Sequence, residues 1–143
     1  MENDTIKLLK EVDSGCIMAV NSIRQVMEYS MKDGLSQTLE KYKEAHEKLQ
    51  QEASEMLKEH GEPDKQPSLM ASAMSWTTTE MKMFMRDDNT QIAKIMMNGC
   101  NMGIQTIGED ISKYQQASKE AVQLAEKLID LEERFASDIK EFL

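Results

Sequence analysis

The stretch Gly61-Glu62-Pro63-Asp64-Lys65-Gln66-Pro67 divides the chain into two helical halves. Its glycine and prolines disfavour a continuous helix, because proline lacks a backbone N–H and glycine loses much conformational freedom on ordering. Periodic apolar positions predict two long helices on each side, at about residues 4–32, 36–60, 89–115 and 118–143. We therefore predict an all-α protein: a four-helix bundle whose second and third helices are joined by a long crossover.

Each predicted helix carries apolar residues every three or four positions, as expected of a helix that buries one face. The clearest stripe belongs to the last segment and consists of Ala121, Leu124, Leu128, Leu131, Phe135, Ile139 and Phe142. Short turns are predicted at Asp33-Gly34 and near Gln116-Ala117-Ser118, so the two helices on either side of each turn should be antiparallel. Ser36 is expected to cap the second helix.

The crossover is predicted to contain a short extra helix from Ser68 to about Arg86. At 1.5 Å per residue this helix would be roughly 27 Å long, enough to carry the chain back along the bundle. The first and last helices would then run in one direction, and the second and third in the other. One stripe of the crossover helix is rich in methionine: Met70, Met74, Met81 and Met85. Thioethers bind copper(I) but also pack adaptably, so we interpret the stripe as packing, with a homodimer through this helix left open.

The chain of 143 residues suffices for one domain, residues 1–143, and its formal net charge is −9. This charge argues against a nucleic-acid partner, because binding to phosphates relies on clustered Lys and Arg. No apolar run approaches the roughly 20 residues that a membrane span requires. The N-terminus begins Met1-Glu2-Asn3-Asp4, without a basic and apolar signal region, so we expect a cytoplasmic protein.

Several polar residues are predicted to share one height in the middle of the bundle. Counting along each helix places them roughly 20 Å from the same end. The set consists of Asp13, Cys16, His46, Cys100 and Glu132. Four-helix bundles build their metal and ligand sites from such inward-facing side chains.

Two further segments carry a family resemblance: the stretch from Gly61 through Pro67-Ser68-Leu69 to Trp76, and Asn98-Gly99-Cys100-Asn101-Met102-Gly103-Ile104. In these segments and in its layout the chain resembles the rubrerythrin- and ferritin-like superfamily, especially small bacterial members with a helical crossover. The resemblance covers nearly the whole chain. It implies a ferritin-like four-helix bundle, with iron or manganese as the metals to consider.

The superfamily's metal-binding pattern is one Glu on each of two helices and a Glu-x-x-His pair on each of the other two. This chain has no Glu-x-x-His; Lys43 stands three residues before His46. Asp13, His46 and Glu132 remain as candidate ligands, too few for two octahedral ions. We therefore expect a non-catalytic structural or interaction protein with a degenerate metal site and no cofactor. The alternative is a metal-binding or ferroxidase-type protein with a reduced, atypical site.

Each candidate ligand also has a structural interpretation. An ionised Asp13 on an apolar stripe is costly unless paired, so it either turns to the surface or caps a neighbour, or it acts as a remnant ligand or as a partner of His46. His46 is either a hydrogen-bonded core histidine or a ligand. Cys16 and Cys100 are expected to be free thiols that pack as small hydrophobes, with a soft metal site shared with His46 as the alternative.

Two glycines of the third predicted helix, Gly99 and Gly103, lie one turn apart. Each lowers helix propensity by roughly 1 kcal/mol, so a compensating role is expected. We predict a close helix crossing against small residues such as Gly15 and Ala19. A cavity for a small ligand is the alternative.

Overall fold

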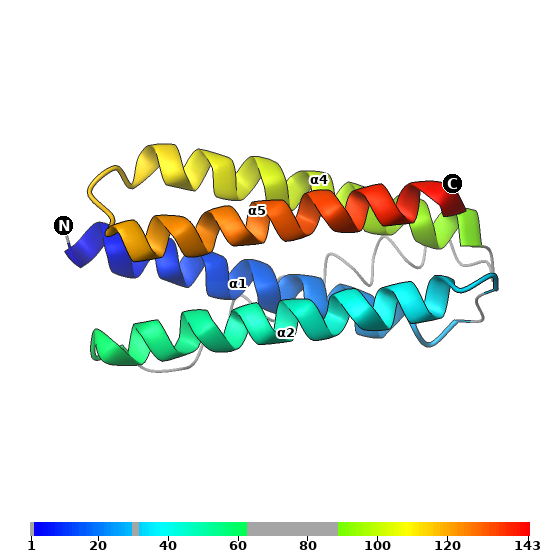
Figure 1. Cartoon of the computed structure of the whole chain (residues 1–143), viewed down its shortest axis with the longest axis horizontal. Coiled ribbons are helices and arrows are strands. Elements are labelled where there is room, and N and C mark those ends of the chain that lie inside the picture. The colour runs from blue at the N-terminus through cyan, green and yellow to red at the C-terminus, as the bar shows by residue number, and fades with distance from the viewer. Residues whose placement is uncertain (1, 30–31, 63–88) are drawn as a thin grey trace.

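The computed structural model describes residues 2–29, 32–62 and 89–143 of the chain. Figure 1 shows long helices lying side by side, namely α1 (Glu2–Val26), α2 (Leu35–Glu59), α4 (Asn89–Lys113) and α5 (Lys119–Ile139). A short 3₁₀ helix, η1 (Lys140–Phe142), follows α5. The described residues form four long helices and no strand, which confirms the all-α prediction.

Helices α1 and α5 run in one direction, and α2 and α4 run in the other (Figure 1). Hydrogen bonds at the two ends of the bundle agree with this order. At one end Asn89 Nδ2, at the start of α4, donates to the Lys32 carbonyl just before α2, at 2.7 Å. At the other end the Ser118 N–H, before α5, donates to Thr5 Oγ1 in the first turns of α1, at 2.8 Å. The chain thus leaves α2 at one end of the bundle and enters α4 at the opposite end, as the crossover hypothesis predicted.

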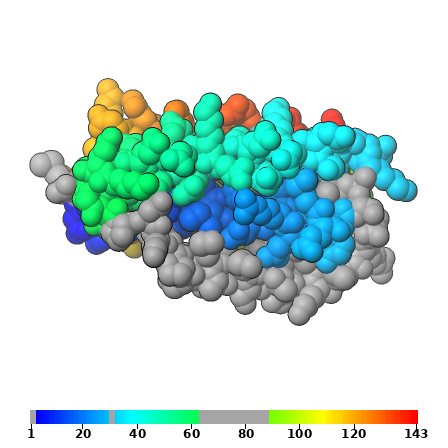
Figure 2. Space-filling model, turned by 90° about the horizontal axis from the view of Figure 1, so that it is seen from below, coloured from blue at the N-terminus to red at the C-terminus, as the bar shows by residue number. Residues whose placement is uncertain are grey.

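The strongest packing lies within each pair of sequential helices, α1 with α2 and α4 with α5. Figure 2 shows α1 and α2 in contact along their length. Helix α1 also contacts α4 and α5, and α2 contacts α5, so the two hairpins enclose a common core. None of the described helices is both long and apolar enough to cross a membrane.

Two helix ends differ from the sequence prediction. Helix α1 ends at Val26, before residue 32, and the chain then reaches a turn in which Asp33 has φ 57° and Gly34 has φ 85°. Gly34, not Ser36, is the N-cap residue of α2, and no side chain caps that helix. Because glycine adopts a left-handed conformation at little cost, the turn closes at Gly34 and the helix begins at Leu35.

The C-terminal end of α2 follows the prediction from Gly61. Gly61 has φ 78°; its N–H donates to the Lys58 carbonyl at 2.9 Å, and the Glu62 N–H donates to the Leu57 carbonyl at 3.0 Å. These two bonds form a Schellman motif, in which a left-handed residue ends the helix. An ion pair of 2.7 Å between Glu62 and Lys10 joins this end to α1.

The predicted crossover helix lies outside the described residues. This applies to its methionine stripe, Met70, Met74, Met81 and Met85, and to the homodimer predicted through it.

Replacing Gly61 with alanine should lower the free energy of unfolding by about 1 kcal/mol, because a side chain is strained in the left-handed region. Gly108→Ala is the matched control, since a Cβ at Gly108 in α4 would meet no atom within 4 Å. That substitution should raise the free energy of unfolding by up to about 1 kcal/mol. Urea unfolding of both variants measures the difference. Equal stability of the two variants would show that Gly61 does not hold the left-handed end of α2.

Candidate functional site

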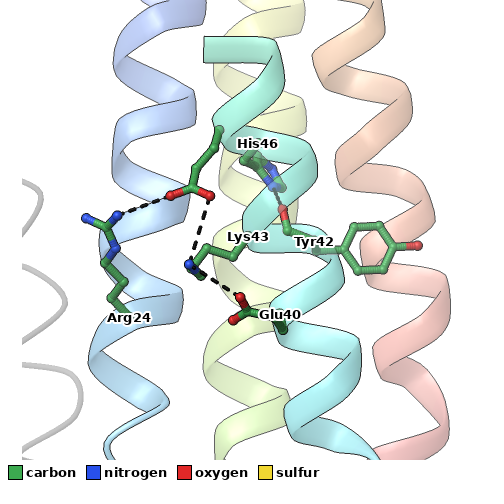
Figure 3. A network of polar contacts seen from close by, with 6 residues as sticks. Arg24, Glu40, Tyr42, Lys43 and His46 are labelled. Atoms are coloured by element: carbon green, nitrogen blue, oxygen red, sulfur yellow. Dashed lines mark hydrogen bonds and ion pairs between the residues drawn. The ribbon is translucent and has the colours of Figure 1, made fainter. Parts of the chain in front are cut away.

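A histidine and a carboxylate meet in the core at mid-height of the bundle. His46 comes from α2 and Glu132 from α5, and their residues are 0% and 6% exposed. His46 Nε2 is hydrogen-bonded to Glu132 Oε1. On the other side of the ring, Nδ1 lies 2.6 Å from the carbonyl oxygen of Tyr42, one turn earlier in α2 (Figure 3). Both ring nitrogens therefore have a partner within the protein.

These partners determine how many protons the His46–Glu132 pair holds. A backbone carbonyl only accepts hydrogen bonds, so Nδ1 of His46 must carry a hydrogen. Nε2 and the carboxyl oxygen can bond only when one further hydrogen lies between them. The pair is then either an imidazolium with a carboxylate or an imidazole with a carboxylic acid. Its net charge is zero in both forms, which limits the cost of burying it.

Aromatic rings surround the pair on the α2–α5 side. The rings of Tyr42 and Phe135 are stacked with centroids 4.6 Å apart, and the His46 ring is tilted against Phe135 at 5.9 Å. Tyr42 Oη donates to Asp138 Oδ2 at 2.5 Å. Burial, followed by this hydrogen bond, raises the pKa of Tyr42 to about 12, so the hydroxyl keeps its proton at neutral pH. Helices α2 and α5 are thus joined by side-chain hydrogen bonds at two neighbouring levels.

A charged network lies on the outer side of the same part of α2 (Figure 3). Glu47 accepts a hydrogen bond from Arg24 of α1 at 3.1 Å, and Lys43 lies 3.9 Å from Glu47 and 3.6 Å from Glu40. Ion pairs between exposed side chains contribute little to stability because water screens them. The buried pair, and not this network, is therefore the stronger candidate for a functional or structural role.

Asp13 is buried, with 3% of the residue exposed. Its Oδ1 accepts a hydrogen bond from Gln50 Nε2 of α2 at 2.7 Å. The interpretation that turned Asp13 to the surface is therefore wrong, because Gln50 supplies a partner that allows the carboxylate to be buried. The ring nitrogens of His46 bond to Tyr42 and Glu132, so Asp13 is not its hydrogen-bond partner.

The two thiols predicted at this height, Cys16 and Cys100, are both buried and free. Burial, followed by the charge of Glu132, raises the pKa of each thiol above its usual value. A thiol of raised pKa stays protonated at neutral pH, whereas a metal ligand must be a thiolate. Within residues 2–29, 32–62 and 89–143, no three His, Cys, Asp or Glu side chains are grouped to hold a metal ion. Of the predicted metal ligands, the structure brings His46 and Glu132 together and holds Asp13 against Gln50.

A cavity of about 170 Å³ lies beside Glu132, between α1 and α4. Its apolar lining includes Met18, Ala19, Ile23, Met96, Ile107, Leu128 and Phe135. Gly99 and Gly103 also line it. A Cβ at Gly99 would meet no atom within 4 Å, whereas a Cβ at Gly103 would lie 2.5 Å from Glu132 Oε2.

The surroundings of Gly99 and Gly103 therefore differ from those expected for the predicted helix crossing against Gly15 and Ala19. The atoms nearest to an added Cβ at Gly103 belong to Glu132 of α5, and a Cβ at Gly15 would lie 3.2 Å from Leu128 of α5. The missing side chain at Gly103 makes room for the Glu132 carboxyl group, and the missing side chain at Gly99 borders the cavity. The sequence signal that could have predicted the contact between Gly103 and Glu132 was a glycine and a buried glutamate at the same height on two neighbouring helices.

Comparisons with known proteins supply no relative from which a role can be transferred. No family model matches the chain, and neither a curated protein nor a solved structure matches it.

Alanine substitutions at the two glycines should have opposite effects on stability. Gly99→Ala should raise the free energy of unfolding by up to about 1 kcal/mol, because alanine favours the helix and meets open space. Gly103→Ala should lower it by about 1–3 kcal/mol, because the Glu132 carboxyl group is held by His46 and cannot simply swing away. Thermal and urea unfolding of both variants test this contrast. A Gly103→Ala variant that is as stable as Gly99→Ala would contradict the close approach of α4 to Glu132.

Proposed function

We propose that this protein is a ferritin-like four-helix bundle with a structural or interaction role, without an intact di-metal site and without catalytic activity of its own. The observation that carries this proposal is the contact between His46 and Glu132. The two side chains best placed to bind a metal ion at mid-height bind each other instead, and the remaining ring nitrogen is occupied by the Tyr42 carbonyl.

The order and direction of the helices support the ferritin-like part of the proposal. Ferritin-like bundles have one long crossover between two helical hairpins and carry their polar ligands on facing helices in the core. Here the hairpins α1–α2 and α4–α5 pack together, and α2 and α4 run in the same direction. The buried polar pair also lies between facing helices, on α2 and α5.

The chemistry of the donors argues against a di-iron or di-manganese centre. A metal bound through His46 Nε2 would have to displace the hydrogen that this nitrogen shares with Glu132. The ion would gain one imidazole and one carboxylate, whereas two octahedral ions require several more oxygen or nitrogen ligands. Asp13 is held by Gln50, and the raised pKa values of Cys16 and Cys100 keep both thiols protonated.

A reduced, atypical metal site is the competing proposal, and one observation favours it. His46 and Glu132 come from different helices and still converge in the core. The two side chains would converge in the same way if a single metal ion took the place of the hydrogen that they share. Metal loading separates the two proposals directly.

The interaction role is proposed for protein partners. The net charge of −9 opposes binding to nucleic acid, because the phosphate backbone repels an acidic surface. A second copy of the chain, docked through the methionine-rich helix that the sequence predicts in the crossover, remains our proposal for one such partner.

Purified protein that is loaded anaerobically with ferrous iron and then desalted should retain well under one equivalent of iron per chain. The physical reason is the small number of ligands and the existing bond between His46 and Glu132. Metal analysis before and after desalting gives the stoichiometry, and the same experiment with manganese tests the second ion. Retention of two ions per chain, abolished by His46→Ala or Asp13→Ala, would contradict the proposal and support an oxidase-type site.

A further inference from the structure

The cavity between α1 and α4 contains polar groups that its apolar lining does not explain. Ser14 lines the cavity and is 5% exposed, and its Oγ is buried without a hydrogen-bond partner in the described structure. Glu132 also lines the cavity; Oε1 is bonded to His46, whereas Oε2 packs against Gly103, 2.5 Å from the position that a Cβ there would take. Buried polar atoms are almost always hydrogen-bonded, so an orphaned hydroxyl in a cavity indicates a missing partner.

We propose that this cavity binds a small, neutral, largely apolar molecule that carries a hydroxyl group, such as a phenol-sized alcohol. The apolar body fills the space between α1 and α4, and the hydroxyl donates a hydrogen bond to Glu132 Oε2. The Ser14 hydroxyl offers a second hydrogen bond to the ligand. This inference goes beyond the structural role proposed above and does not depend on the metal content of the protein.

The size of the cavity limits the ligand to about one ring. An apolar cavity of about 150 Å³ inside a protein stays dry and binds benzene. The cavity beside Glu132, at about 170 Å³, is only slightly larger. Met18 and Met102 both line it and are 37% and 44% exposed, so they border its solvent side. Unbranched thioether side chains such as these adapt their shape to a ligand more readily than branched ones.

The charges around the cavity favour a neutral ligand. The His46–Glu132 pair already has a net charge of zero, so an ammonium group at Oε2 would leave a buried excess positive charge. A carboxylate ligand would instead meet the acceptor oxygen of Glu132. At the rim, Glu11 is hydrogen-bonded to Asp110, and burial followed by the charge of Asp110 raises the pKa of Glu11. This carboxyl pair thus tends to retain a proton rather than attract a cation.

The test compares the binding of three ring molecules of similar size to the 143-residue chain: phenol, toluene and benzylamine. Titration calorimetry should show phenol binding at one site per chain, about tenfold more tightly than toluene, which lacks the donor. Benzylamine, which is cationic at neutral pH, should bind more weakly than phenol. Absence of saturable phenol binding would overturn the proposal, as would equal affinity for toluene or tighter binding of benzylamine.

Variants locate the bound phenol. Gly99→Leu should abolish binding, because the new side chain occupies the cavity, whereas Gly108→Leu on the same helix should bind as the wild type does. Ser14→Ala should weaken binding several-fold. In the wild type, phenol should shift the methyl NMR signals of Met18 and Met102, which report on the site independently of any variant's folding. Unchanged binding to Gly99→Leu, or unshifted methyl signals at saturation, would overturn the assignment.

Discussion

One buried hydrogen bond, between His46 and Glu132, sets how the two helical hairpins fit together. His46 belongs to the α1–α2 hairpin and Glu132 to the α4–α5 hairpin. Neither side chain can be buried alone without a large desolvation cost, and each supplies the partner that the other requires. A shift of one helical turn between the hairpins would leave both groups unpaired in the core. Apolar side chains can pack in several registers of one hairpin against the other, whereas the hydrogen bond between His46 and Glu132 forms in one register.

Other features of the core follow from the same contact. Glu132 needs room beside α4, and the absence of a side chain at Gly103 supplies it. Burial, followed by the charge of Glu132, raises the pKa of the thiols of Cys16 and Cys100. Protonated thiols and an imidazole with both nitrogens bonded are the basis of our proposal that the polar core has a structural role. Among the described residues, the cavity beside Glu132 is one place where the core can accept another molecule.

Much of this arrangement could be predicted from the sequence because it depends on helix geometry alone. Counting 1.5 Å per residue along helices of predicted direction brought His46 and Glu132 to one height, and the structure joins them. The apolar stripe of α5 was predicted as well, and its residues from Ala121 to Ile139 are buried. The end of α2 was predicted because glycine and proline disfavour a continuous helix, and Gly61 takes the left-handed conformation there.

Two of the differences between prediction and structure have a common physical origin, since they concern rotation of one helix against another. The sequence left open whether Asp13 turned to the surface or stayed in the core, because its partner Gln50 lies on α2 and helical periodicity says nothing of which residues two helices bring together. The contact between Gly103 and Glu132 was missed for the same reason. The start of α2 was misassigned because Ser36 is a good N-cap residue, but the backbone turn at Gly34 closes before it.

A double-mutant cycle on His46→Leu and Glu132→Met tests the central claim most directly. Urea unfolding gives the free energy of unfolding of the wild type, both single variants and the double variant. Our account predicts that each single substitution costs about 3–5 kcal/mol, because it leaves the other group buried without its partner. The double variant should then lose far less than the sum of the two single losses. Additive losses would contradict the account and show that the two side chains are buried independently.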